Sequence, residues 1–347
     1  MRSSQMTRHV KWITIDMDTR YLGTTEQEME IAGEIVRNGG LVAFPTETVY
    51  GLGADAFNAE AVENIYTVKG RPADNPSIVH IWSRDQLPEI TTEIKPVMEK
   101  VMDAFWPGPV TMICRRTFEV PYVTTGGLET VGIRMPSNPA AQAFLKAAGC
   151  PVAAPSANLS GKPSPTTAEH VRDDFDGRID AIIDGGPCEF GIESTVIDLT
   201  GDVPMILRPG IMTAEDFSEK LDMPVILDPA LNKKPEDPDF HPKAPGMKYK
   251  HYAPKAPMII FEGEEEKVLE AIEREKTEHE MEGENVVVLT FGQDGALSAA
   301  HELFAMLRSA DRENADLILA AALPQKGVGF SVMNRMLKSA GFNIRKV

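Results

Sequence analysis

The sequence predicts an α/β protein of two domains, a larger one with helices on a twisted mixed sheet and a smaller one with a doubly wound, Rossmann-like parallel sheet. Many short apolar runs with interspersed helical segments come first. Recurring prolines between residues 228 and 257 then deny both helix and central strand. After them, strand and helix patterns alternate regularly. We therefore expect an N-terminal extension over residues 1–20, a first domain over 21–227, a proline-rich linker over 228–257 and a second domain over 258–347.

The elements of the first domain can be placed in order along the chain. Residues 24–40 have helical spacing, with Thr25 and Glu28 arranged as a capping box. A second helix is expected from Asn58 to Lys69, because Gly70 suits a left-handed C-cap. Further helices are predicted around residues 140–149 and from Thr213, and strands at residues 41–45, 77–82, 110–114, 131–135, 151–155, 179–184, 194–199 and 204–207.

The second domain alternates strand and helix. Strands are predicted at residues 258–262, 285–291 and 316–323. The helices between and after them are expected within residues 262–284, at 295–309 and at 328–340. The first of these alternates glutamate with lysine and arginine, which is typical of a solvated helix face.

Composition excludes several classes of protein. A formal net charge of −17 argues against an extensive nucleic-acid-binding surface, but charges more than about 8 Å apart are screened, so a few local cations can still bind ATP. The three cysteines are widely spaced and predict buried thiols rather than a disulfide framework or a zinc site. The chain has no apolar run long enough to cross a bilayer and no signal-peptide pattern near its start, so we expect a cytoplasmic protein without membrane contact. It also has no P-loop motif.

Cationic and polar residues follow the helix that is predicted to end at Lys69. Pro72 and Pro76 push the residues before them, Arg71 and Asn75, toward extended geometry. A helix end, a reversal and an extended segment thus bring Lys69, Arg71 and Asn75 near one another, as binding of a polyanion would need. The alternative is that Lys69 only complements the negative end of its helix dipole.

More polar residues gather at predicted strand ends, where open sheets form their sites. Thr46 begins a glycine-containing turn that either surrounds a ligand or is only a polar turn. Arg134 ends a strand and precedes a helix start, where free N–H groups attract anions. With Lys69, Arg71 and Arg208 it makes four cations at the edges of apolar elements. They form either a polyphosphate pocket or separate surface ion pairs.

Seven segments in order also carry a family resemblance. They read PTETVYGLGADA, KGRPADNPSIVHI, WPGPVT, VGIRMP, APSANLSG, ESTVIDL and LRPG. This set resembles the YrdC-type L-threonylcarbamoyladenylate synthases, and APGMKYKHYAP with the domain after it resembles their long, two-domain form. The resemblance implies a YrdC-like first domain. It also implies a reaction in which L-threonine, bicarbonate or CO2, and ATP give threonylcarbamoyl-AMP and pyrophosphate, for threonylcarbamoyladenosine modification of tRNA next to the anticodon by a downstream transferase complex.

The resemblance also implies roles for individual residues. Those expected to bind ATP are Lys69, Arg71, Asn75, Arg134, Asn158, Thr166 and Arg208, with Lys69 and Arg71 as the catalytic cations on the triphosphate. Those expected to hold threonine or bicarbonate are Thr46, His80, Asn138, Ser156 and Ser194. Magnesium is expected with ATP, held through phosphate oxygens and water rather than by a protein cage. His80 lies on a strand face with apolar residues, so a packed core histidine is the alternative there.

The linker is expected to act as a lid. Its prolines favour an extended path across the pocket, where it would exclude water from a labile carbamate, and Tyr249 or Tyr252 would hydrogen-bond to the nucleotide. Two other classes of function remain open from the residues. One is a serine hydrolase using Ser156, although the chain lacks the usual nucleophile-elbow motif. The other is an RNA-binding module without catalysis, which would contact tRNA through a basic surface.

Overall fold

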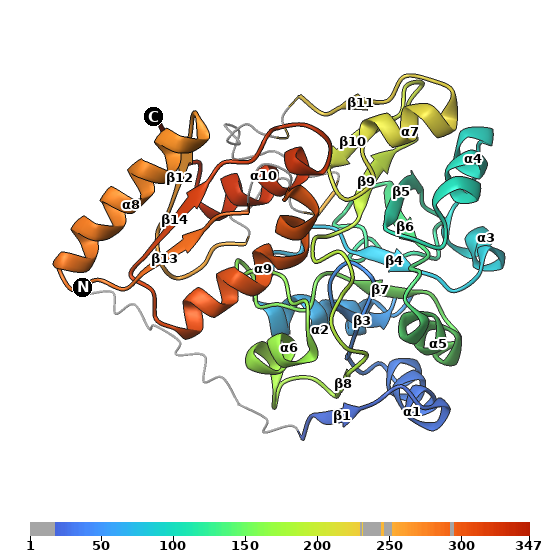
Figure 1. Ribbon diagram of the computed structural model, residues 1–347. Helices are drawn as coiled ribbons and strands as arrows, with labels where there is room; N and C mark the ends of the chain where they lie inside the picture. The colour runs from blue at the N-terminus through green and yellow to red at the C-terminus, as the bar shows by residue number, and fades with distance from the viewer. Residues whose placement is uncertain (1–17, 230, 232–243, 246–251, 292–294) are drawn as a thin grey trace, which may run out of the picture.

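The structure, a computed structural model, describes residues 18–229, 231, 244–245, 252–291 and 295–347. It contains two separate sheets, one of eleven strands and one of four. Figure 1 shows the larger sheet with its helices on one side of the molecule and the smaller sheet with α8, α9 and α10 on the other. Residues 1–17 of the expected extension at 1–20, and most of the expected linker, lie outside the described residues. The fold class predicted from the sequence is confirmed.

The larger sheet is mixed, in the order β1-β8-β2-β3-β7-β4-β6-β5-β9-β10-β11. Its strands are β1 (Arg20–Leu22), β2 (Val42–Phe44), β3 (Gly51–Asp55), β4 (Ile78–His80), β5 (Val110–Arg115), β6 (Thr130–Arg134), β7 (Val152–Ala154), β8 (Ala181–Ile183), β9 (Thr195–Asp198), β10 (Met205–Arg208) and β11 (Ile226–Leu227). Its helices are α1 (Glu26–Arg37), α2 (Ala59–Lys69), α3 (Leu87–Ile90), α4 (Pro96–Phe105), α5 (Pro139–Ala148), α6 (Ala168–Phe175) and α7 (Ala214–Leu221). A short 3₁₀ turn, Arg84–Gln86, precedes α3.

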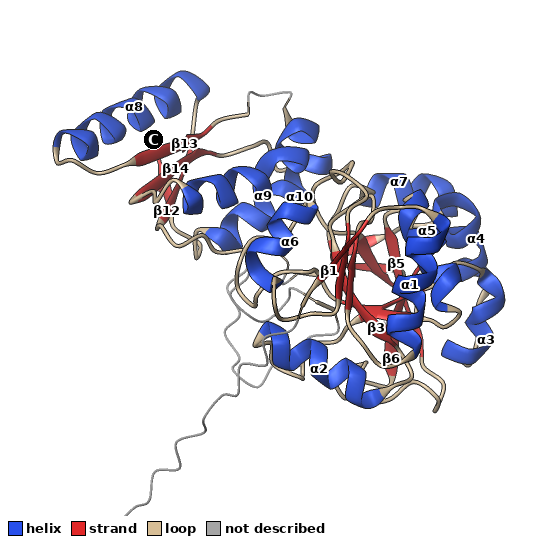
Figure 2. Cartoon of the chain, turned by 90° about the horizontal axis from the view of Figure 1, so that it is seen from below, coloured by secondary structure: helices blue, strands red, loops and turns tan. Residues whose placement is uncertain are grey.

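Helices cover both faces of this sheet (Figure 2). Alternation along β2 shows how: Val42 and Phe44 pack with α1 and α5, whereas Ala43 packs with α2 and α6. A further apolar cluster joins β5 to α4 and α7. Because both faces are covered, open positions for polar side chains remain at the strand ends.

The local signals in the sequence produced the expected helix ends. Thr25 and Glu28 form a capping box on α1, and Asn58 caps α2. Gly70 ends α2 with φ 61° and ψ 36°, in the left-handed region that favours glycine. Lys69 therefore occupies the last turn of α2, as predicted.

The structure also contains elements that the sequence analysis does not predict, among them β1, β3, α4, α6 and β15 (Ile344–Lys346). Strand β3 reads GLGAD, and its glycines weaken the strand signal. They are needed because a Cβ on Gly53 would lie 2.7 Å from the Val152 side chain and 3.0 Å from Phe44. Two of the three cysteines are buried as expected, whereas Cys150 is half-buried.

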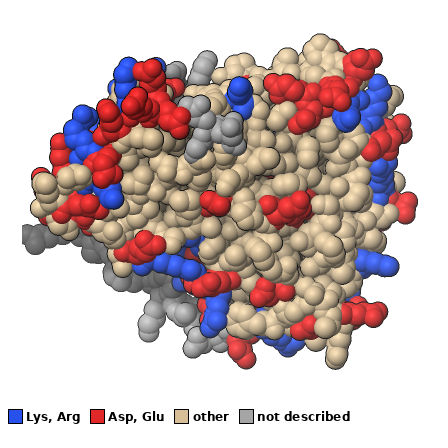
Figure 3. Space-filling model, viewed as in Figure 1, with Lys and Arg blue, Asp and Glu red and all other residues tan. Residues whose placement is uncertain are grey.

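The second domain is a parallel sheet in the order β13-β14-β12-β15, with β12 (Met258–Glu262), β13 (Val286–Leu289) and β14 (Leu317–Ala321). Helix α8 (Glu265–Met281) packs on one face, while α9 (Ala296–Arg312) and α10 (Gly327–Ser339) pack on the other. Acidic and basic side chains crowd the exposed side of α8 (Figure 3), as the charge pattern predicts. No helix in the described ranges combines the length and apolar character that crossing a membrane requires.

The two domains meet through buried contacts. In α9, the Arg308 guanidinium donates to Asp174 at 2.8 Å and to the backbone oxygen of Pro163. Gly191 has φ +74°, and a Cβ there would lie 2.3 Å from the backbone oxygen of His301. Only glycine allows this close approach of α9 to the first domain. The second domain is therefore packed directly against the loops of the first.

Candidate active site

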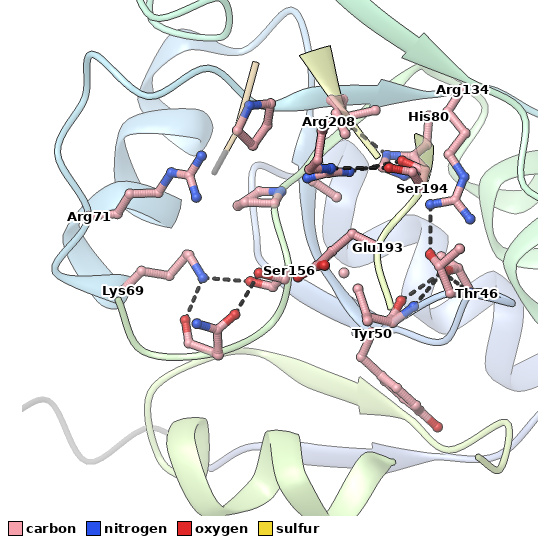
Figure 4. Close-up of a pocket in the computed structure, with 18 of the residues that line it drawn as sticks. Thr46, Tyr50, Lys69, Arg71, His80, Arg134, Ser156, Glu193, Ser194 and Arg208 are labelled. Carbon is pink, nitrogen blue, oxygen red and sulfur yellow. Dashed lines mark hydrogen bonds between the residues drawn. The ribbon is translucent and has the colours of Figure 1, made fainter. Parts of the chain in front are cut away.

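A polar pocket opens at the strand ends of the larger sheet (Figure 4) and has a volume of about 700 Å³, counting the part open to solvent. Its walls come from the turn after β2, the end of α2, the ends of β4, β6 and β10, and the loop after β7. Pro245 and Tyr252 of the predicted linker also line it.

Most of the residues singled out in the sequence line this one pocket. They are Thr46, Lys69, Arg71, His80, Arg134, Ser156, Asn158, Ser194, Arg208 and Tyr252. Figure 4 shows Lys69 and Arg71 on one side, Thr46, His80 and Arg134 on the other, and Arg208 and Ser156 between them. The four cations therefore converge on a common hollow rather than forming separate surface ion pairs.

Lys69 is held at the pocket wall by backbone oxygens. Its Nζ donates to the Ser156 carbonyl oxygen at 2.5 Å and to the Asn158 carbonyl oxygen. Only 2% of Lys69 is exposed. Burial, together with the nearby charge of Arg71, holds the pKa of Lys69 well below its usual value. An anion bound beside Lys69 would favour its charged form.

Arg71 is half-buried, and its guanidinium donates to the backbone oxygens of Asn75 and Pro76 at distances from 3.0 to 3.4 Å. The reversal predicted after α2 therefore forms, with Arg71 bound to its backbone. This arrangement orients the guanidinium beside Lys69 in the pocket wall.

Arg134 forms a buried ion pair that the sequence analysis does not predict. Its Nη2 donates to Glu47 Oε1 at 2.7 Å, and its Nη1 donates to Thr48 Oγ1 at 2.9 Å. The other Glu47 oxygen accepts from the Ser137 backbone N–H. Arg134 is thus largely neutralised before any ligand binds, so the four cations are not equivalent.

Arg208 differs from Arg134 in its bonding. Its Nε donates to the Ser194 carbonyl oxygen at 3.1 Å and its Nη2 to Ser194 Oγ at 3.0 Å. Ser194 Oγ also lies 2.8 Å from Thr111 Oγ1. No ion pair joins Arg208 to a carboxylate within the described residues. Burial lowers the pKa of Arg208 to about 10, so its guanidinium keeps its charge at neutral pH.

His80 is both packed and part of the pocket lining, so the two alternatives open in the sequence are compatible. Its Nδ1 lies 3.1 Å from the Ile78 carbonyl oxygen, and its ring meets Phe44 edge-on at 5.7 Å. Burial, followed by the positive charge of Arg134, lowers the pKa of His80 to about 3. The imidazole is neutral at physiological pH and adds no charge to the pocket.

The depressed pKa of His80 predicts how stability depends on pH. In the unfolded chain this histidine takes up a proton below pH 6.5, whereas in the folded chain it does so only near pH 3. The folded state is therefore most stable, relative to the unfolded state, above pH 6.5, and it loses stability as the pH falls from 6.5 toward 3. Between pH 6 and 5, chemical unfolding should show a free energy that falls about 1.4 kcal/mol per pH unit more steeply for the parent than for His80→Gln. Equal slopes would contradict a buried neutral imidazole.

Ser156 lacks the surroundings of a nucleophile. Its Oγ donates to Asn158 Oδ1 at 2.5 Å, and the Asn158 amide nitrogen in turn donates to the backbone oxygens of Leu159 and Lys162. No histidine is bonded to Ser156 within the described residues. A serine nucleophile needs an adjacent base to activate it. This environment argues against a serine hydrolase that uses Ser156. Ser156 is instead part of the hydrogen-bonded wall of the pocket.

Three predicted site residues do not line the pocket. Asn138 Oδ1 accepts from the Ala140 and Ala141 N–H groups and so caps α5. Thr166 contacts His170, and Asn75 is buried with an Oδ1 that finds no hydrogen-bond partner among the described residues. Tyr249 lies outside the described residues.

Other residues that shape the pocket stand in segments that the sequence singles out, but sequence reasoning assigned them no role. Thr48 and Glu193 line it, and Glu47 orients Arg134 from behind. Glu193 and Glu47 stand beside residues that were singled out, but a carboxylate in an acidic chain carries no distinguishing signal. One signal could have identified the two carboxylates. Several cations were predicted around one buried pocket, and buried charges require partners, so nearby acidic residues were candidates.

The fold and this pocket define the class of protein, a two-domain relative of the Sua5, YciO and YrdC group. Residues 34–210 match the family model described as "Telomere recombination", and residues 212–341 match the one described as "Threonylcarbamoyl-AMP synthase, C-terminal domain".

Similar proteins from two organisms share one name, and a solved structure resembles this chain over nearly its full length. The threonylcarbamoyl-AMP synthase of Pyrococcus abyssi is 46% identical over 332 residues, which cover 93% of this chain and 96% of that protein. The synthase of Bacillus subtilis is 45% identical over 341 residues, with the same coverage of each chain. The crystal structure of P. abyssi Sua5 complexed with L-threonine gives a TM-score of 0.90 at 45% identity, covering 95% of this chain and 100% of that one. The chain belongs to the threonylcarbamoyl-AMP synthase family of nucleotidyltransferase-type enzymes.

Proposed function

We propose that this protein makes threonylcarbamoyl-AMP and pyrophosphate from L-threonine, bicarbonate or CO2, and ATP, in the cytoplasm, for the threonylcarbamoyladenosine modification of tRNA next to the anticodon. The observation that supports this most directly is the convergence of Lys69, Arg71, Arg134 and Arg208 on one pocket of a chain with net charge −17. A triphosphate beside an amino acid is the kind of ligand that such a pocket suits.

The chemistry fits a site that positions reactants and neutralises charge. The threonine amine captures CO2 as a carbamate, a carbamate oxygen attacks the α-phosphorus of ATP, and pyrophosphate leaves. Charge grows on the departing pyrophosphate, which Lys69 and Arg71 would stabilise. Arg208, with Asn158, would hold phosphate or the nucleoside, and Arg134 would contribute less because Glu47 already binds it.

The opposite side of the pocket would hold the amino acid and the captured CO2. Thr46, Ser156 and Ser194 provide hydroxyl groups there, and neutral His80 provides a polar surface without charge. Holding the carbamate beside the α-phosphorus raises its effective concentration, which replaces the need for a protein nucleophile. Asn138, which caps α5, and Thr166 and Asn75, which lie outside the pocket lining, would act on this chemistry only through the backbone that they support.

Magnesium would enter with ATP. Glu193 is the one carboxylate among the described residues that line the pocket, and its oxygens already accept from Ser164 and Arg335. This donor set fits a magnesium ion held through phosphate oxygens and water, where it would offset phosphate charge.

We also propose that the segment over residues 228–257 closes the pocket as a lid. Pro245 and Tyr252 line the pocket, and the Ala253 N–H donates to the Gly161 carbonyl oxygen at 2.8 Å. Ala244 is buried against Ile113, Val196 and Leu207 of the first domain. These contacts support a path of the segment across the pocket mouth, where it would exclude water from the carbamate.

Pyrophosphate release with ATP, bicarbonate and each amino acid in turn tests the proposed function. We expect release with threonine and little release with the other amino acids or with bicarbonate omitted. Release that does not depend on threonine would contradict the proposal. In the same assay, Tyr252→Ala should release more pyrophosphate without threonine than the parent, because water would enter; an unchanged background would count against the lid.

Contacts with tRNA and with a downstream threonylcarbamoyl-transferase complex remain predictions. A steep decrease of tRNA affinity with rising salt would support a direct tRNA contact, because phosphate binding releases counterions. The overall negative charge makes such a contact a local feature rather than a broad basic face.

A further inference from the structure

Where the two domains meet, charged side chains are buried directly behind the pocket. Glu193 lies in the loop before β9, lines the pocket and is 5% exposed. Arg335 lies in α10 of the second domain and is 0% exposed. The Arg335 Nε donates to Glu193 Oε2 at 3.1 Å, so an ion pair crosses the domain boundary and ends at the pocket wall.

The two oxygens of Glu193 are both occupied, and neither bonds to Arg208. Oε2 is bound by Arg335, and Oε1 accepts from the Ser164 hydroxyl at 2.6 Å. The Tyr252 hydroxyl also hydrogen-bonds to this carboxylate. The Arg208 guanidinium donates instead to Ser194. Burial opposes the ionisation of Glu193, but the charges of Arg335 and then Arg208 hold its pKa below the usual value. The Glu193 carboxylate is thus close enough to Arg208 for the two charges to interact, but the arginine that hydrogen-bonds to it is Arg335.

Stability alone does not explain Arg335. A buried ion pair is often no more stabilising than apolar residues of the same volume, because desolvation opposes the attraction. The Nη2 atom of Arg335 is also buried without a hydrogen-bond partner in the described part of the chain. A buried polar atom without a partner lowers stability. A role in the pocket would account for an arginine buried at this position.

We propose that Arg335 is a positioning residue through which the second domain completes the active site. By binding Glu193, it keeps this carboxylate from pairing with Arg208, so the Arg208 charge stays available to the phosphate groups of ATP. This inference rests on the proposed function. It gives the second domain a direct part in substrate binding: without Arg335, the Glu193 carboxylate could pair with Arg208 and neutralise the charge that ATP requires.

The test compares Arg335→Met in two backgrounds. In the parent, we expect the KM for ATP to rise about tenfold with a smaller change in kcat, because a charge-assisted contact to phosphate is lost. In a Glu193→Gln background no carboxylate competes for Arg208, so Arg335→Met should change the KM by less than about twofold. Arg335→Lys should restore part of the parent KM, because its charge still attracts Glu193.

A matched control lies on the same helix. The Ser331 hydroxyl donates to the Gly210 carbonyl oxygen at 2.7 Å across the same boundary and does not touch Glu193. Ser331→Ala should leave the KM for ATP unchanged even if thermal unfolding shows lower stability. Arg335→Met leaves the Glu193 carboxylate unpaired, which can prevent folding. The double variant has no such carboxylate, and its KM for ATP compared with that of Glu193→Gln still shows whether loss of Arg335 raises the KM through domain packing alone.

Two results would overturn the inference. One is an equal rise of KM on loss of Arg335 in both backgrounds, and the other is an equal rise in Ser331→Ala, since each would mean that domain packing alone matters. Failure of the proposed function would look different, because the parent itself would then release no pyrophosphate in response to threonine.

Discussion

Lys69→Met is expected to weaken ATP binding by about ten- to a hundredfold, as the loss of a charge-assisted hydrogen bond of about 1.5–3 kcal/mol implies. Two of the three Nζ protons are directed at the Ser156 and Asn158 carbonyl oxygens, which leaves one for a phosphate. Methionine retains most of the buried stem, whereas alanine would also leave a cavity. ATP affinity is measured by calorimetry on the folded variant.

Lys95→Met provides the control for this change. The Lys95 Nζ also donates to two backbone oxygens, those of Leu199 and Thr200, but Lys95 does not line the pocket. Its replacement should leave ATP affinity unchanged. Equal affinities in the parent and in Lys69→Met would show that Lys69 is a structural lysine and would remove it from the catalytic assignment.

Glu47→Ala is expected to lower the free energy of unfolding by about 3–5 kcal/mol, because it leaves the buried charge of Arg134 without its partner. The side chains of Arg134 and Glu47 are 4% and 2% exposed, so water cannot take over the lost bond. The Ser137 N–H would lose its acceptor as well. Denaturant unfolding followed by circular dichroism gives the difference.

A surface pair sets the scale for this measurement. Arg37 and Glu30 lie 2.5 Å apart, but their side chains are 41% and 63% exposed. Glu30→Ala should therefore cost less than about 1 kcal/mol. If Glu47→Ala lowers the free energy of unfolding by a similarly small amount, the ion pair of Arg134 and Glu47 is effectively solvated. Arg134 would then contribute to ATP binding as strongly as the other cations, as the sequence suggests.

Local sequence signals account for much of the fold. Capping residues such as Thr25, Asn58 and Gly70 act within one helical turn, so their partners stand nearby in the chain and the helix ends follow from the pattern. The glycine-rich strand β3 has no such pattern. It is a strand because its backbone pairs with β2 and β7, and the close packing there leaves no room for a side chain at Gly53.

The candidate site divides in the same way. Residue type and position at element ends were enough to select Lys69, Arg71, Arg134 and Arg208, which all line one pocket. The same reasoning selected Asn138, whose amide oxygen caps α5 instead. A polar residue at a helix start serves equally well as a cap or as a ligand contact, and local sequence does not separate the two roles.

By itself, the amino-acid order determined the two-domain α/β architecture, several helix ends and the set of cations at the ends of helices and strands, because hydrophobic periodicity and capping act between near neighbours. Only the tertiary structure decided which cations are neutralised. Glu47 meets Arg134 across 87 positions and Glu193 meets Arg335 across 142. Such pairings depend on which loops the packed sheets bring together, and buried charge then selects its partner by distance rather than by sequence.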